Sequence, residues 1–169
     1  HGKRVIVHIG WEKTGASALQ AFCNRTRAWL AERGVSYPAI GRHAQHLQLY
    51  FDLASGRADR VARARRACKA AIEASDAHTV VFSHESLHEC SPGLFRQVIG
   101  DEHEIQIVAY IREPVEQVVS FFVTRLRFGQ VAPWPLLAAV RGHLQISGRF
   151  HDPMTSLTAL KNTFGPESV

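Results

Sequence analysis

The chain has 169 residues, of which 46% are hydrophobic, and this length and composition predict one globular domain with a substantial core. Its formal net charge of +5 fits either an ordinary basic surface or attraction for an anionic ligand. No apolar stretch approaches the ~20 residues that a membrane-spanning helix needs, so we expect no membrane span.

Hydrophobic periodicity and turn signals divide the chain into alternating strands and helices. In chain order, the predicted elements are a strand at 5–9, a helix at 17–32, an extended piece at 35–38, helices at 44–55 and 58–75, a strand at 79–83, a helix at 92–99, a strand at 104–111, a helix opened by Pro114, a loop at 129–135, and helices at 136–144 and 153–164. The alternation indicates an α/β fold in which a parallel sheet is flanked by helices. Without a repeat or a linker, residues 1–169 are predicted to form a single domain.

Two of these helices have an apolar stripe that we expect to face the core. In the helix at 17–32 the stripe is Leu19, Phe22, Cys23, Thr26 and Leu30. In the helix after Pro114 it is Val115, Val118, Val119, Phe122 and Leu126.

The most informative segment is the loop between the first strand and the first helix, Gly10-Trp11-Glu12-Lys13-Thr14-Gly15-Ala16-Ser17. A glycine-bounded loop between a buried strand and a helix start makes an anion cradle, because its N–H groups converge and the helix N-terminus adds partial positive charge. Lys13 adds a full positive charge. In ATP- or GTP-binding loops the lysine follows the second glycine, whereas Lys13 precedes Gly15.

This order of residues resembles the 5′-phosphosulfate loop of sulfotransferases, which reads close to G-x-x-K-T-G-T-T-x-L. The matching positions are Gly10, Lys13, Thr14, Gly15, Ser17 and Leu19. Ala16 stands where threonine is common, so one hydroxyl contact is missing while the backbone N–H remains.

The resemblance implies a P-loop-like three-layer α/β/α sandwich that uses the donor 3′-phosphoadenosine 5′-phosphosulfate without a metal. It also implies that Lys13 neutralises charge at the bridging oxygen while the N–H groups of Thr14, Gly15, Ala16 and Ser17 hold the 5′-phosphate. The chain is expected to be incomplete at its C-terminus, since family members continue after the helix end at Phe164-Gly165 through a strand and a basic loop.

A second segment, Ala109-Tyr110-Ile111-Arg112-Glu113-Pro114, is followed by Ser120. It resembles the 3′-phosphate motif of sulfotransferases, in which a strand ends in R-[DE]-P and a serine follows on the next helix. Arg112 would hold the phosphate with its planar guanidinium, and Ser120 would donate its hydroxyl. The alternative is that Arg112 pairs with Glu113 or Glu116 and that Ser120 is a surface residue.

Transfer to an acceptor hydroxyl or amine also needs a general base. Glu85, just past the predicted strand at 79–83, is the first candidate, and its alternative is a helix cap or an ion pair. His46 and Glu12 are further candidates, although His46 also fits a structural helix residue. His8, within a strand, is expected to be structural, and Trp11 suits either ligand contact or packing.

The resulting hypothesis is a cytoplasmic sulfotransferase acting on a carbohydrate, lipid or secondary metabolite. Two alternatives stay open, a P-loop-type small-molecule kinase and a non-catalytic sulfotransferase-like module. The arginine-rich helix at 58–75 has no interleaved aromatics, so we expect a solvated helix face and no nucleic-acid partner. Cys23, Cys68 and Cys90 lack metal-ligand spacing and are expected to be free thiols. The sequence chooses neither the acceptor nor the oligomeric state.

Overall fold

The computed structural model describes residues 2–41, 45–129 and 153–169. At its centre lies a four-stranded parallel sheet in the order β2-β3-β1-β4. The strands are β1 (Arg4–Gly10), β2 (Val35–Ser36), β3 (Thr79–Ser83) and β4 (Glu104–Tyr110). The predicted strands at 5–9, 79–83 and 104–111 are confirmed to within one residue at each end, and the extended piece at 35–38 supplies the edge strand β2.

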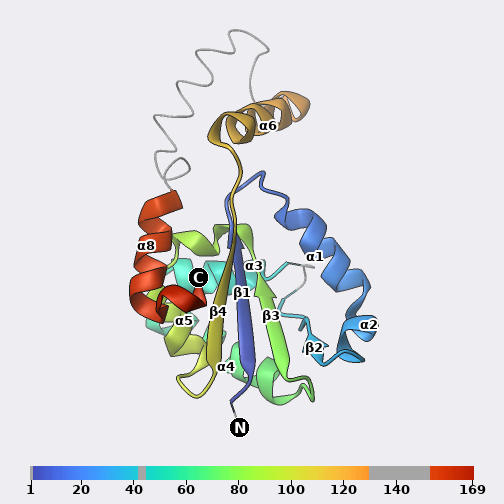
Figure 1. Ribbon diagram of the computed structural model, residues 1–169, viewed down its shortest axis with the longest axis vertical. Coiled ribbons are helices and arrows are strands. Elements are labelled where there is room, and N and C mark those ends of the chain that lie inside the picture. The colour runs from blue at the N-terminus through green and yellow to red at the C-terminus, as the bar shows by residue number, and fades with distance from the viewer. Residues whose placement is uncertain (1, 42–44, 130–152) are drawn as a thin grey trace.

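Helices flank this sheet, which confirms the predicted α/β class and is consistent with a three-layer sandwich. They are α1 (Ala16–Arg25), α2 (Arg27–Ala31), α3 (Leu47–Ala54), α4 (Ala58–Glu73), α5 (Pro92–Ile99), α6 (Pro114–Arg127) and α8 (Pro153–Phe164), with the 3₁₀ turns η1 (Glu85–Glu89) and η3 (Pro166–Ser168). In Figure 1, α4 and α5 lie behind the strands, and α1 and α2 lie beside β3 and β2. The helix expected at 136–144 and most of the loop at 129–135 lie outside the described residues.

The core is built on one face of the central strand. Alternate residues of β1, Val5, Val7 and Ile9, are at most 1% exposed. They belong to one buried cluster with residues of α4 and α5, such as Cys68 and Phe95. A strand that is paired on both sides and covered by helices is a rigid base, and it carries the predicted anion loop at its carboxyl end.

The helix expected at 17–32 is two helices, and part of its predicted core stripe is wrong. The break falls at Thr26, whose backbone leaves the helical region and whose hydroxyl donates to the Phe22 carbonyl oxygen at 2.8 Å. Phe22 is 46% exposed, whereas Gln20 is buried. Gln20 replaces it inside because its amide donates to the Glu85 carboxylate, a polar partner that hydrophobic periodicity does not reveal.

The stripe predicted for the helix after Pro114 is also wrong in part. Val115 is 67% exposed and Val119 is 47% exposed, while Val118 and Gln117 are buried. Figure 1 shows α6 projecting beyond the carboxyl edge of the sheet. Only the side of α6 that meets the loop after β1 is therefore covered by described residues, and Gln117 lies on it, donating to the Glu12 carbonyl oxygen at 2.8 Å.

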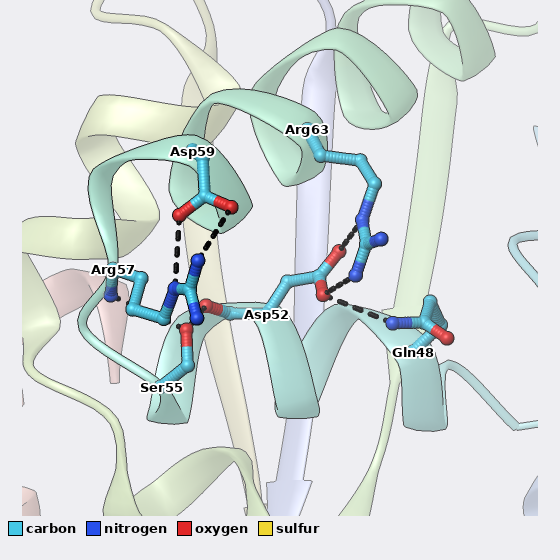
Figure 2. Close-up of polar contacts among 6 residues, drawn as sticks. All are labelled: Gln48, Asp52, Ser55, Arg57, Asp59 and Arg63. Atoms are coloured by element: carbon cyan, nitrogen blue, oxygen red, sulfur yellow. Dashed lines mark hydrogen bonds and ion pairs between the residues drawn. The ribbon is translucent and has the colours of Figure 1, made fainter.

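A buried carboxylate ties α3 to α4 (Figure 2). Asp52 is 2% exposed and accepts hydrogen bonds from both Arg63 nitrogens Nε and Nη2, the first at 2.8 Å. Gln48 Nε2 donates to the same carboxylate at 2.9 Å. The paired guanidinium and the amide together offset the loss of water around the Asp52 charge.

We expect Asp52→Ala to lower the free energy of unfolding by about 2 kcal/mol, because it leaves the donors of Gln48 and Arg63 without their acceptor. Asp59 is the matched control, since its carboxylate also binds an arginine, Arg57, but is exposed (Figure 2). Asp59→Ala should change stability little. Urea titrations of both variants measure their free energies of unfolding. Equal destabilisation by the two substitutions would contradict the claim that the buried Asp52 carboxylate stabilises the fold more than the exposed Asp59 carboxylate.

Candidate functional site

The loop that follows β1 turns sharply before α1. Lys13 has φ 67° and Gly15 has φ 101°, so two of its residues adopt left-handed backbone, which a lysine rarely does. The Thr14 hydroxyl donates to the Trp11 carbonyl oxygen at 2.7 Å. A Cβ at Gly10 would lie 3.1 Å from the Thr14 Oγ1 atom, so glycine lets the loop close on the strand end.

The N-terminus of α1 has no side-chain cap. Gly15 is the N-cap residue, and the first helical hydrogen bond runs from the Ala18 N–H to its carbonyl oxygen at 3.0 Å. The N–H groups of Ala16 and Ser17 precede that bond and have no acceptor within the described residues. Uncapped N–H groups together with the helix dipole make this end attractive to an anion.

A cavity of about 420 Å³ opens at this helix end. Its wall consists of Trp11, Glu12, Lys13, Gly15, Ala16, Ser17, Glu85, Phe121, Thr124, Arg125 and Phe128. The loop and α1 supply one side, and η1 supplies Glu85. The helix α6 supplies Phe121, Thr124 and Arg125, and Phe128 follows at its C-terminal end. The cavity thus combines cations, backbone donors, two carboxylates and an apolar surface within a volume that suits a small-molecule ligand.

Arg112 lies beside the loop, although it is far from it in sequence. Its Nη1 atom donates to the Lys13 carbonyl oxygen at 3.2 Å. Its Nε atom also donates to the Glu116 carboxylate at 3.0 Å, which is the ion pair that the alternative hypothesis expected. The guanidinium therefore lies just beyond the end of β4, next to the loop. Glu116, in the first turn of α6, holds it in this position.

Ser120 is half-buried on α6, where its carbonyl oxygen accepts a hydrogen bond from the Thr124 hydroxyl at 3.0 Å. It is not part of the cavity wall, whereas Thr124, one turn further along α6, is. The structure therefore places Arg112 next to the loop, but neither Arg112 nor Ser120 is part of the cavity wall.

Glu85 begins the 3₁₀ turn that follows β3, and it is half-buried in the cavity wall. Its Oε2 atom accepts a hydrogen bond from Gln20 Nε2 at 3.0 Å, which fixes the carboxylate against α1. Sequence reasoning predicted Glu85 but missed Gln20. No sequence signal identified Gln20, because its burial depends on the Glu85 carboxylate, which is distant in sequence.

His46 lies outside the cavity, and both of its ring nitrogens are occupied. Nδ1 accepts from the Ser83 N–H at 2.8 Å, and Nε2 lies 2.9 Å from the Pro38 carbonyl oxygen, so the ring is neutral with its proton on Nε2. The side chain is 1% exposed, and burial lowers the pKa of His46 to about 4. These contacts hold His46 against Pro38 and the end of β3, which is a structural role.

His8, within β1, is also buried, and its Nδ1 atom lies 2.7 Å from the Ser83 hydroxyl. Burial lowers the pKa of His8 to about 4, as it does for His46. The expectation that His8 is structural agrees with this packing. Trp11 is 2% exposed and lies against the His88 ring, with centroids 4.7 Å apart, so it both packs beneath the loop and forms part of the cavity wall.

The two buried histidines predict a loss of stability in mild acid. An unfolded histidine takes up its proton near pH 6.5, whereas His8 and His46 do so only near pH 4 in the folded chain. Between these values the unfolded state binds more protons, so the free energy of unfolding falls as pH falls, by about 1.4 kcal/mol per pH unit for each histidine. Urea unfolding at a series of pH values measures this slope, and a flat profile across the window would contradict it.

The charge of Glu12 distinguishes this loop from a simple anion cradle. The carboxyl is half-buried in the cavity wall, and burial raises its pKa, while neighbouring Lys13 acts in the opposite direction. Within residues 2–41, 45–129 and 153–169 the Glu12 carboxylate has no hydrogen-bond donor. The site thus holds one carboxylate with a partner, Glu85, and one without.

Among the described residues, no three His, Cys, Asp or Glu side chains are arranged to hold a metal ion. All three cysteines are buried and free, as expected. No described helix combines the length and apolar character that crossing a bilayer requires. No family model matches the chain, and no curated protein or solved structure shows significant similarity to it.

Proposed function

We propose that this protein is a sulfotransferase that uses 3′-phosphoadenosine 5′-phosphosulfate. The observation that carries the proposal is the contact between Arg112 and the Lys13 loop. β1 and β4 are neighbouring parallel strands (Figure 1). Lys13 follows β1 and Arg112 follows β4, and the two residues are in contact beyond the carboxyl ends of these strands. Two adjacent anion-binding groups at strand ends suit a nucleotide with phosphates at both ends of its ribose.

The donors of the cavity, together with Arg112 beside the loop, fit such a ligand. The N–H groups of Ala16 and Ser17, the helix dipole and the Lys13 ammonium suit the 5′-phosphosulfate, and the Arg112 guanidinium suits the 3′-phosphate. On binding, the Arg112 guanidinium would either leave the Glu116 carboxylate for the phosphate or donate hydrogen bonds to both. When bound, the donor supplies a sulfuryl group, which passes to the acceptor oxygen as its bond to the 5′-phosphate oxygen breaks.

The residues of the chain would then have separate tasks. Glu85, held by Gln20, takes the proton from the acceptor hydroxyl as that oxygen bonds to sulfur. Lys13 and the N–H groups of α1 stabilise the electron pair left on the phosphate oxygen. The products are a sulfate ester and adenosine 3′,5′-bisphosphate, with the proton on Glu85. Most of the catalytic effect comes from positioning and charge stabilisation.

Isothermal titration calorimetry with adenosine 3′,5′-bisphosphate, compared with ATP and magnesium, tests this function. We expect the bisphosphate to bind without a metal and ATP to bind more weakly. Preference for magnesium-ATP would instead support a kinase. If the folded chain binds neither nucleotide, the sulfotransferase proposal fails for this chain and a non-catalytic module is favoured.

A further inference from the structure

Glu12 is unusual in its surroundings. Its carboxylate lies next to Lys13 in a loop whose other groups attract anions, and it shares the cavity wall with Glu85. Burial raises the pKa of Glu12, the positive charges of Lys13 and His88 act in the opposite direction, and the negative charges of Glu85 and Glu89 raise it further. In the part of the chain that the structure describes, no cation pairs with it. A half-buried carboxylate without a partner is costly, and a positively charged ligand group would relieve that cost.

The cavity also has a part that a nucleotide anion would not use. With the 5′-phosphosulfate at Lys13 and the α1 N-terminus, the remaining wall consists of Trp11, Glu12, Glu85, Phe121, Thr124, Arg125 and Phe128. Its charged groups are therefore two carboxylates and one guanidinium, so the carboxylates are in excess. Phe128 is 70% exposed, so it offers an apolar surface. Carboxylates next to aromatic rings form a chemical environment that binds organic cations. The fully buried Trp11, whose Nε1 atom has no partner among the described residues, packs the Glu12 end of this wall.

We propose that the acceptor carries a protonated amine and that Glu12 binds this ammonium group. The assignment rests on the proposed function for the place of the donor, and it deepens that function by naming the acceptor class. Glu12 is a specificity residue, because it contacts the acceptor away from the hydroxyl that receives the sulfuryl group. Glu85 remains available as the base. The apolar body of the acceptor packs against Phe121 and Phe128, opposite the cradle.

Three size-matched probes test the inference in calorimetric or ligand-observed NMR titrations: benzylamine, benzyl alcohol and benzoate. Each is titrated with and without saturating adenosine 3′,5′-bisphosphate. We expect benzylamine to bind most tightly, and Glu12→Gln to weaken it about tenfold or more while changing benzyl alcohol less than about twofold. Glu12→Asp should retain the preference for the amine. Glu104→Gln is the matched control, since Glu104 is an exposed glutamate at the other end of β4.

The outcomes separate this inference from the proposed function. If wild type binds benzylamine no better than benzyl alcohol, or binds benzoate best, the amine assignment is overturned even when the bisphosphate binds. Equal weakening by Glu12→Gln and Glu104→Gln would also overturn it, because a general loss of negative charge would then explain the effect. Bisphosphate binding should stay equal or tighten in Glu12→Gln, since the variant removes a negative charge near the phosphates.

Discussion

Replacing Lys13 by methionine should weaken binding of adenosine 3′,5′-bisphosphate by at least about tenfold. Loss of one hydrogen bond or ion pair to a charged group in a partly enclosed site is enough to lower the affinity by this factor. Methionine keeps most of the side-chain volume of lysine. Lys13 has a positive φ, which is unfavourable for any residue with a side chain. Methionine, like lysine, is unbranched at Cβ and meets the same backbone strain, so the loop should keep its shape.

Calorimetry measures the effect, and Lys161→Met is the matched control because Lys161 is exposed on α8, away from the cavity. The control should bind like wild type. If Lys13→Met and Lys161→Met both bind like wild type, the loop is not the phosphate site. If both weaken binding equally, the nucleotide is attracted only by the overall positive charge of the chain, and lower affinity at high salt would accompany that result.

Replacing Glu85 by glutamine should lower the rate of sulfuryl transfer by about 10²–10⁴-fold, the range expected for removal of a general base. The amide can still accept the hydrogen bond from Gln20, so the fold and the 3₁₀ turn should persist. Binding of adenosine 3′,5′-bisphosphate should stay the same or tighten slightly, because a negative charge leaves the cavity. The change is therefore expected in the chemical step and not in nucleotide affinity.

Single-turnover transfer to an acceptor found by screening amines with a hydroxyl group measures this effect. Glu89→Gln is the matched control, because Glu89 is exposed on the same turn and accepts a hydrogen bond from Tyr50 at 2.9 Å, outside the cavity wall. We expect the control to keep near-wild-type rates. An unchanged rate in Glu85→Gln would remove Glu85 as the base and leave Glu12 as the next candidate on the wall.

The sheet was predictable because its strands carry strong local signals. Val5–Ile9 and Thr79–Ser83 are short runs rich in β-branched residues, and their parallel pairing follows from the helices between them. The position of the loop at the N-terminus of α1 was predictable for a similar reason, since the loop and the helix start are adjacent in sequence. Glu85 could be placed near it because carboxyl ends of parallel strands share one edge.

Details that depend on side-chain partners could not be predicted. At the break, the Thr26 hydroxyl and N–H both donate to the Phe22 carbonyl oxygen, and the burial of Gln20 depends on Glu85, which lies 65 residues away. His46 was a candidate base until its contacts with Ser83 and Pro38 were known. The sequence could not predict that Phe121 and Arg125 line the cavity. That placement depends on the direction in which α6 leaves β4, and hydrophobic periodicity does not determine this direction.

The two-ended anion site is the central claim, and a comparison of two nucleotides tests it most directly. Adenosine 3′,5′-bisphosphate and adenosine 5′-phosphate should be titrated into wild type and Arg112→Ala by calorimetry. We expect wild type to prefer the bisphosphate by about tenfold or more, and Arg112→Ala to lose that preference while binding the monophosphate as before. Equal affinity of wild type for the two nucleotides, or an undiminished preference in Arg112→Ala, would contradict a 3′-phosphate site at the end of β4.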